Sequence, residues 1–334
     1  KRQLLDYLII SATVSIAINY IARNIAKRNK ILVDLPNRSR KFHKRPTPLT
    51  GGLSIFISLL ISAKLYIDLN ELNGFIPVFS SMLILGSFFL ILIFLIDDIK
   101  PIRPSLRLIT QALCSYFIIN STGVYLESFG NLLGFGEIYL GSFGIPITIF
   151  CVVGIMNAFN MIDGINGLCS GLAFMAMLFM GIFYNGFINT HLVYAVGAIA
   201  GFLIFNLGII GNKRWVFLGD HGSNLLGFLT AISMIGASQE IRFDFSPITA
   251  LWLISIPFLD CIGLILKRIS KGVGPFTADR DHLHHKLMAK GYSANKTLVI
   301  ILCIAISSSL IGIYLQSNYS DSTSFFCFFI YSIV

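Results

Sequence analysis

Long apolar runs separated by short polar segments extend over the whole chain. Most of these runs are close to the roughly 20 residues that a helix needs to cross a membrane. The pattern therefore predicts an all-α polytopic membrane protein with about eleven transmembrane helices. The runs cover residues 4–21, 52–69, 77–96, 106–126, 143–160, 165–184, 190–210, 222–238, 247–266, 297–316 and 323–334. Because the last run is shorter than the roughly 17 residues that a span requires, we expect its helix to be cut short.

The composition supports this interpretation. Hydrophobic residues make up 55% of the 334 residues, charged residues only 12%, and the mean hydropathy is +0.79. Such a chain cannot cover its surface with polar groups as a soluble protein does, so we expect a single transmembrane domain spanning 1–334. The six cysteines lie within or beside apolar runs without a C-x-x-C pair, and we interpret them as small apolar residues. The Gly-rich loop 127–142 is expected to form a short periplasmic hairpin.

Lys and Arg are distributed unevenly among the predicted loops. With the N-terminus outside, all but four of the 25 Lys and Arg residues fall in loops on the cytoplasmic side. Because cytoplasmic loops carry the excess of positive charge, we predict a periplasmic N-terminus. The net charge of +9 follows largely from this bias, and the lack of a solvated basic domain argues against nucleic-acid binding.

Five polar segments, which we call islands 1 to 5, interrupt the apolar pattern. They are residues 34–52, 97–107, 157–167, 217–223 and 279–286. The charge bias puts all five on the cytoplasmic face. Polar groups at membrane depth are unfavourable, so a set that recurs on one face is expected to form a shared site.

Island 2 begins with two adjacent carboxylates, Asp97 and Asp98, at the end of an apolar run. Neighbouring residues on a helix point about 100° apart, so we expect these carboxylates to do different jobs, such as metal binding and proton abstraction. A solvated helix end is the alternative, but the helix dipole disfavours negative charge there. Arg103 and Arg107 follow, where they could hold phosphate oxygens.

Island 3 places Asn157, Asn160 and Asp163 on one face of a helix, before Gly164 and Gly167. The glycines permit a tight loop with its backbone close to a ligand. Asn157 could equally join two helices by a hydrogen bond. For Asn160 and Asp163, the following glycines favour a ligand site.

Island 4 presents Asp220 between glycines at the start of a helix. Amides at a helix start attract phosphate, and a carboxylate there could neutralise a divalent cation. An N-cap role for Asp220 is the common alternative, but it does not explain the glycines. Phe217 is either an interfacial aromatic residue or a ring that stacks on a base.

Island 5 contains three histidines, His282, His284 and His285. A zinc site is one interpretation of such a group. No Cys accompanies them, and the cations nearby, including Arg280 and Lys286, favour a polyphosphate instead.

Island 1 is a basic, Pro-rich loop, and much of its positive charge sets the orientation of the chain in the membrane. The Thr-Pro-x-x-Gly-Gly sequence at its end predicts a fixed loop beside the site. Together, the acids, amides, arginines and histidines of the five islands predict a site for magnesium and a diphosphate. Such residues are typical of a phosphoryl-transfer site, here one without a P-loop.

At these residues, from about Ile31 to Ser293, the chain resembles the polyprenyl-phosphate N-acetylhexosamine-1-phosphate transferase family, and it is most similar to the bacterial members that use UDP-N-acetylglucosamine. All five islands occur in the family's order. The resemblance implies that undecaprenyl phosphate attacks the β-phosphorus of UDP-N-acetylglucosamine and releases UMP. The product would be the lipid-diphosphate sugar that starts O-antigen (lipopolysaccharide) or related glycan synthesis at the bacterial inner membrane.

The resemblance also implies roles for individual residues. The metal would be Mg²⁺, with Mn²⁺ as the alternative, on Asp220 and Asn160. The catalytic residues would be Asp97, as base or phosphate-orienting group, Asp98 and Asp163. The substrate-binding residues would be Lys44 for the lipid phosphate, Phe217 and Asn166 for uracil, and Arg107, Arg280, His282, His284 and His285 for the diphosphate. Many relatives have Asp at the position of Asn166, but an amide still suits uracil.

Several alternatives stay open. The same chemistry could use another UDP-N-acetylhexosamine, such as N-acetylfucosamine, or the muramoyl-pentapeptide donor, although the form of the histidine island fits the latter less well. A secondary transporter would carry acids near the bilayer midplane on broken helices, whereas these acids lie at cytoplasmic helix ends. The sequence leaves a homodimer open.

Overall fold

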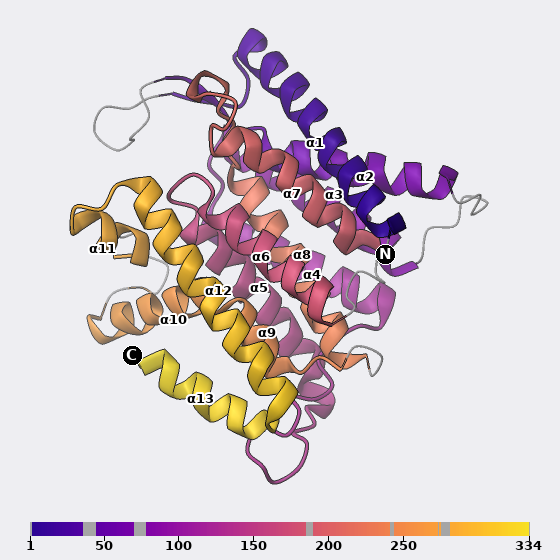
Figure 1. The fold of residues 1–334 in the computed structure, drawn as a ribbon, viewed down its shortest axis with the longest axis vertical. Helices are drawn as coiled ribbons and strands as arrows, with labels where there is room; N and C mark the ends of the chain where they lie inside the picture. The colour runs from indigo at the N-terminus through magenta and orange to yellow at the C-terminus, as the bar shows by residue number, and fades with distance from the viewer. Residues whose placement is uncertain are drawn as a thin grey trace. The chain divides into compact units, whose positions relative to one another are not determined.

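The computed structural model describes residues 2–35, 45–69, 78–184, 190–240, 244–272, 274 and 281–333. Within them the regular structure consists of thirteen α-helices, short 3-10 turns and one two-stranded sheet (Figure 1). The predicted all-α class is confirmed. The sheet joins β1 (Val33–Asp34) to β2 (Thr47–Pro48) in antiparallel register.

The chain forms two compact units. The first comprises Lys1–Thr122 and Phe187–Leu226, and the second comprises Gly123–Gly186 and Gly227–Val334. Helix α8 (Asp220–Gln239) begins in the first unit and ends in the second. The two units share this helix, so the division into units does not decide whether the chain is one domain. The single transmembrane domain stays a prediction.

The first unit contains α1 (Arg2–Asn29), α2 (Gly51–Leu69), α3 (Val78–Ile99), α4 (Pro104–Thr122) and α7 (Thr190–Asn206). Helix α1 packs on α7 and α2, and α3 packs on α4 (Figure 1).

Helices α1 and α7 approach closely because α7 presents glycines to α1. A Cβ atom on Gly197 would lie 2.6 Å from the Leu8 carbonyl oxygen, and one on Gly201 would lie 2.5 Å from that of Ala12. Ser11 Oγ donates a 2.8 Å hydrogen bond to the carbonyl of Tyr194. Small residues at this spacing are typical of helix pairs in membranes, where backbone proximity replaces the hydrophobic effect.

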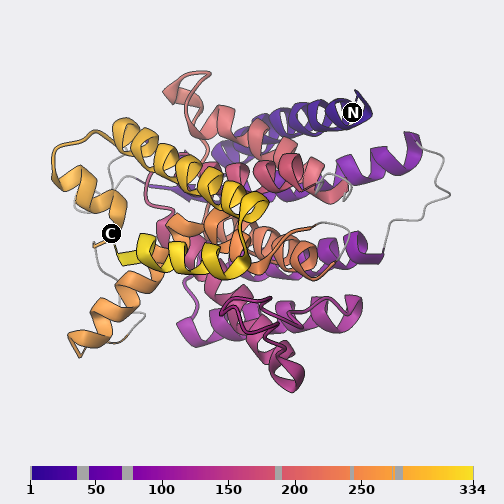
Figure 2. The same cartoon turned by 60° about the horizontal axis from the view of Figure 1, so that its bottom comes forward.

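The second unit contains α5 (Gly144–Ile162), α6 (Leu168–Phe183), α9 (Pro247–Leu253), α10 (Ser255–Ser270), α11 (Leu283–Ala289), α12 (Ala294–Asn318) and α13 (Asp321–Ile333). Helix α12 packs on α6, α9, α10 and α13, and Figure 2 shows α12 and α13 side by side. Trp252 lies in the core between them: its ring centroid is 5.1 Å from that of Phe328, and its Nε1 donates to Ser324 Oγ at 3.1 Å.

The apolar run 247–266, which the pattern predicts as one helix, is broken. Helices α9 and α10 are bent by 86° across Ile254. Pro257 lies in the first turn of α10, where its missing N–H leaves no hydrogen bond unmade. The expectation of one continuous helix here is therefore wrong.

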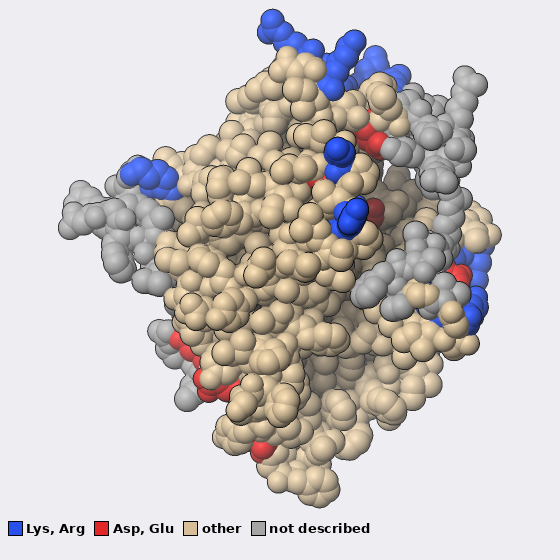
Figure 3. Space-filling view, turned by 180° about the vertical axis from the view of Figure 1, so that it is seen from behind, with Lys and Arg blue, Asp and Glu red and all other residues tan. Residues whose placement is uncertain are grey.

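Four described helices are long and apolar enough to cross a membrane: Leu4–Asn29, Ser81–Ile99, Gly141–Ile162 and Ala294–Asn318. The bent pair α9 and α10 makes a fifth if it counts as one span. Three further apolar helices, Gly51–Leu65, Leu168–Phe183 and Leu192–Asn206, are shorter. In the view of Figure 3, most of the surface is neither acidic nor basic. A polytopic membrane protein is confirmed, while the number of eleven spans and the orientation stay predictions.

The loop 127–142 forms the expected hairpin. Ser128 and Tyr139 make an antiparallel bridge, and Phe129 N donates to the Ile138 carbonyl at 3.0 Å. Its periplasmic location stays a prediction.

Candidate functional site

Islands 1, 4 and 2 meet in the first unit. Phe217 N donates to the Pro48 carbonyl at 2.8 Å, Gly51 N donates to the Phe217 carbonyl at 2.9 Å, and Gly52 N donates to that of Leu218 at 3.0 Å. These backbone bonds fix the end of island 1 against the start of island 4. The prediction of a fixed loop at this end is confirmed.

Glycines allow these two islands to touch. A Cβ atom on Gly52 would lie 2.3 Å from the Gly222 Cα, a distance that no real Cβ contact shows. Gly219 adopts φ +78°, which side chains other than glycine rarely tolerate, and a Cβ there would meet Asp98 Oδ2 at 2.8 Å. The glycines that surround Asp220 therefore serve the close approach of islands 1, 2 and 4.

Asp98 holds the start of α8. Its Oδ1 accepts a 3.0 Å bond from Asp220 N, and its Oδ2 accepts from His221 N at 3.3 Å and also pairs with His221 Nδ1. The His221 side chain is fully buried and that of Asp98 is only 7% exposed. Asp98 thus satisfies backbone N–H groups at the helix start, where a carboxylate is also favoured by the helix dipole. His221, for which the sequence suggested no role, completes the arrangement.

Asp97 points to a different set of partners. Its Oδ1 accepts from Ile102 N at 2.8 Å and from Arg107 Nη2 at 2.9 Å, and Arg107 Nε lies 2.8 Å from its Oδ2. Arg107 Nη1 also lies 3.4 Å from Asp220 Oδ2. One guanidinium therefore bridges two carboxylates. Asp97 and Asp98 thus contact different groups, and the expectation that they do different jobs stays a prediction.

Asp97 and Asp220 supply the two carboxylates of this cluster. The Asp97 side chain is fully buried and that of Asp220 is 42% exposed, so the bridged pair has one enclosed and one accessible member. Among the described residues, no three His, Cys, Asp or Glu side chains gather as a metal site. Mg²⁺ does not need such a cage, because it is commonly held by one or two carboxylates together with phosphate and water.

Islands 3 and 5 meet in the second unit. A Cβ atom on Gly164 would lie 2.0 Å from His284 Nε2, so the glycine loop lies directly on this ring. His282 Nδ1 is 2.8 Å from Asp260 Oδ2, and Leu283 N donates to Asp260 Oδ1 at 2.8 Å. Asp260, on α10, therefore holds the start of the histidine island. Asp260 was not predicted as a site residue, although an acid in an apolar run is a signal for one.

The His284 ring is buried, with 1% exposed, and neither ring nitrogen has a hydrogen-bond partner among the described residues. The rings of His282 and His284 stack with centroids 5.5 Å apart, and His285 lies 4.1 Å from His284. Burial first, then repulsion by His285 and His282, lowers the pKa of His284 to about 4. A neutral ring with unused polar atoms is suited to bind a ligand's hydrogen-bonding groups.

The remaining predicted residues lie as follows. Asn160 lies in the last turn of α5, Asp163 is exposed directly after the helix, and the Asp163 N–H donates to the Asn160 carbonyl at 3.4 Å. Asn166 is half-buried in the turn before α6, and Phe217 is half-buried in the first unit. Lys44 and Arg280 lie outside the described residues. The single site formed by all five islands stays a prediction.

The lowered pKa of His284 predicts a pH-dependent stability. The unfolded chain binds a proton at this ring near pH 6.5, whereas the folded chain binds it only near pH 4. The free energy of unfolding should therefore fall as the pH drops from 6.5 to 4, by up to roughly 3 kcal/mol from this group. Chemical unfolding of the wild type and of a His284→Gln variant in the same detergent checks this. An equal pH dependence in both proteins would refute the assignment.

Comparisons of the sequence with known proteins identify its family. Residues 80–238 match the model described as glycosyl transferase family 4. An undecaprenyl-phosphate alpha-N-acetylglucosaminyl 1-phosphate transferase from Yersinia pestis is 35% identical over 303 residues, which cover 90% of this chain and 80% of the relative. Proteins of the same name from Haemophilus influenzae and Escherichia coli K12 are 36% and 33% identical. Each match covers 90% of this chain, and the matches cover 86% and 80% of the two relatives. The chain therefore belongs to glycosyl transferase family 4.

Proposed function

We propose that this protein transfers N-acetylglucosamine 1-phosphate from UDP-N-acetylglucosamine to undecaprenyl phosphate and releases UMP. Relatives named for this activity are 35% and 33% identical to the chain over 90% of its length. The observation that carries the proposal is the pair Asp97 and Asp220 bridged by Arg107. A carboxylate pair with one cation suits a diphosphate and its metal ion.

Asp220 and Asn160 would hold Mg²⁺ in this reaction, with Asp97 beside them as the group that orients phosphate. The bound ion would neutralise charge on the diphosphate. Arg107 would then hold phosphate oxygens while keeping the two carboxylates in place. Asp98, through His221 and the first amides of α8, would fix the direction in which Asp220 points.

We further propose that Asp97 orients groups and does not need to remove a proton. A phosphate monoester has a second pKa of about 6, so the acceptor lipid is already largely dianionic at pH 7. The bonds of Asp97 to Ile102 N and Arg107 support a positioning role. An Asp97→Asn variant should stay impaired at every pH. Full recovery of its activity at high pH would instead support a base.

Residues of the second unit would contribute to binding of the donor. His284, neutral at pH 7, together with His282 and His285, would hydrogen-bond the diphosphate, and Asp163 would support this region. We carry over the remaining roles from the family likeness: Arg280 for the diphosphate, Phe217 and Asn166 for uracil, and Lys44 for the lipid phosphate. The product would start an O-antigen or related glycan at the bacterial inner membrane.

Activity tests the proposal directly. The purified protein, supplied with Mg²⁺, undecaprenyl phosphate and one UDP-sugar at a time, should release UMP and form a lipid-linked sugar with UDP-N-acetylglucosamine. If product formed only with UDP-N-acetylfucosamine or another donor, the proposed reaction would stand and the proposed sugar would be wrong. No UMP from any donor would reject the transferase and favour the transporter alternative.

Arg107 offers a sharper test. Replacing it by alanine should lower kcat/KM by about 100-fold, because the site loses the cation that joins two carboxylates. Lysine should restore little, since it cannot reproduce a planar fork. Lys100→Ala is the matched control, because Lys100 is an exposed cation in the same island. Equal activity of the Arg107→Ala and Lys100→Ala proteins would remove Arg107 from the site.

A further inference from the structure

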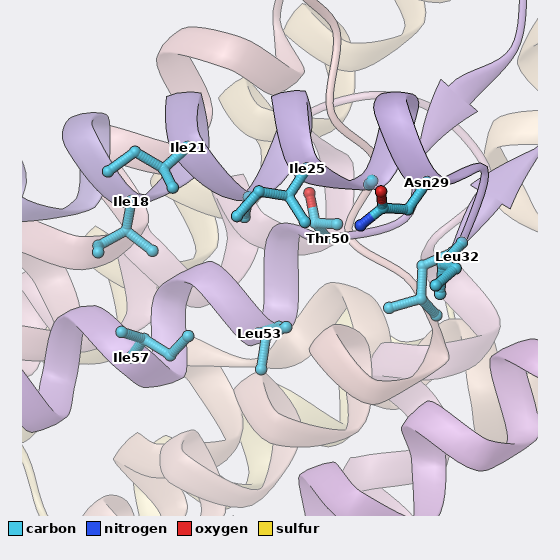
Figure 4. A pocket seen from close by; sticks show the side chains of 11 residues that line it. Ile18, Ile21, Ile25, Asn29, Leu32, Thr50, Leu53 and Ile57 are labelled. Atoms are coloured by element: carbon cyan, nitrogen blue, oxygen red, sulfur yellow. The ribbon is translucent and has the colours of Figure 1, made fainter.

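A groove in the first unit lies between α1 and α2, and no carboxylate of the described residues lines it. It encloses about 280 Å³. Figure 4 shows isoleucines of α1 on one side and Leu53 and Ile57 of α2 on the other. Ile21, Ile25 and Ile31 line it and are 51–55% exposed, so the groove opens on an apolar surface. An exposed apolar groove on a membrane helix is suited to a hydrocarbon chain.

One end of the groove is polar. Thr50 is 3% exposed, and its Oγ1 is buried without a hydrogen-bond partner among the described residues. Figure 4 shows this oxygen directed toward α1, between Ile25 and Asn29. A buried hydroxyl without a partner is unfavourable, so a ligand that supplies a hydrogen-bonding atom here would be stabilised.

Positive charge gathers at the same end. Asn29 is flanked in sequence by Lys27, Arg28 and Lys30, and between residues 20 and 52 the only acid is Asp34. Basic clusters at the ends of membrane helices attract anionic lipid head groups. The groove therefore combines an apolar channel, a buried hydroxyl and a basic rim.

We propose that this groove binds an anionic glycerophospholipid, with one acyl chain along α1 and α2 and its head group at Thr50 and the basic rim. The lipid would be distinct from the acceptor substrate. Its head group would contact the segment that contains Pro48 and Leu49. The Leu49 N–H donates to the Leu32 carbonyl at 2.7 Å, and the Pro48 carbonyl accepts from Phe217 N. Binding would thereby steady island 1 against island 4.

Native mass spectrometry of the full chain, with phosphatidylglycerol and phosphatidylcholine of identical acyl chains, tests this without turnover. We expect phosphatidylglycerol to bind at least about tenfold more tightly than phosphatidylcholine. Thr50→Val should weaken it about tenfold, because the hydroxyl is lost, whereas Thr50→Ser should retain it. Ile25→Trp should also weaken binding by filling the groove. Ile9→Trp, at a similarly exposed position of α1 outside the groove, is the matched control.

Four results would overturn the proposal that a lipid binds in this groove, and a fifth would change the lipid. They are equal binding of the two lipids, binding that Ile9→Trp weakens as much as Ile25→Trp, and binding that Thr50→Val and Ile25→Trp leave unchanged. The fourth is loss of a dimer in Ile25→Trp with unchanged lipid binding, which would make a second copy of the chain the occupant. If undecaprenyl phosphate bound in place of phosphatidylglycerol and showed the same variant pattern, the groove would belong to the acceptor instead. Because the readout is lipid retention, its failure is independent of whether UMP is released.

Discussion

Replacing Asp98 by alanine should lower kcat by about 100-fold or more, although the side chain need not touch the substrate. Asp98 binds the N–H groups of Asp220 and His221 and the His221 ring, and both side chains of the pair are buried. Its loss would leave an imidazole buried without its partner and would free the start of α8 to move. A displacement of about 1 Å at Asp220 is enough for this loss of rate. Initial rates of UMP release at saturating substrates measure it.

The conservative variant separates positioning from charge. Asp98→Asn retains an oxygen that can accept from the Asp220 N–H and an amide that can donate to a neutral His221 ring. We expect it to recover a substantial part of the lost rate. A double-mutant cycle with His221→Ala should be strongly non-additive, because both residues act through one contact. If Asp98→Asn is as inactive as Asp98→Ala, the negative charge itself is required and the positioning role fails.

Substituting Gly164 by alanine should raise KM for the UDP-sugar by about tenfold to 100-fold. The new methyl group would lie 2.0 Å from His284 Nε2, so the ring or the loop must move. Overpacking of this kind commonly costs about 1–3 kcal/mol, which in a binding site corresponds to that range of affinity. Isothermal titration with the donor, alongside steady-state KM, measures the effect.

A glycine in the preceding helix provides the control. Gly154 lies in α5, and a Cβ atom there would meet nothing within 4 Å. Gly154→Ala should therefore leave KM unchanged and, if anything, stabilise the helix slightly. If Gly164→Ala binds the donor as tightly as the wild type, His284 does not hold the donor.

The sequence predicted those features that depend on neighbouring residues. The 100° separation of Asp97 and Asp98 anticipated that they contact different groups, and the Gly pair at residues 51 and 52 anticipated a fixed loop. The alternating pattern of 127–142 anticipated a hairpin. In each case the relevant geometry follows from a few consecutive positions.

Features that depend on distant parts of the chain were not accessible in this way. Pro48 pairs with Phe217, and Asp260 pairs with His282. The periodicity of apolar residues along the chain carries no information about such pairs. Apolar content marks where helices lie but not where they stop, so a continuous helix was expected across Ile254 where α9 and α10 bend. Pro257 was a local signal for this break that hydropathy alone does not register.

The close packing of α1 on α7 has a consequence for synthesis of the protein. The residues that Ser11 and Ser15 contact on α7 lie 183 positions later in the chain. At roughly 5–20 residues per second, the ribosome needs on the order of ten to forty seconds to reach them. During this interval the small-residue face of α1 has no partner on its own chain. The contact of α1 with α7 can therefore form only late in synthesis, after most of the first unit has been made.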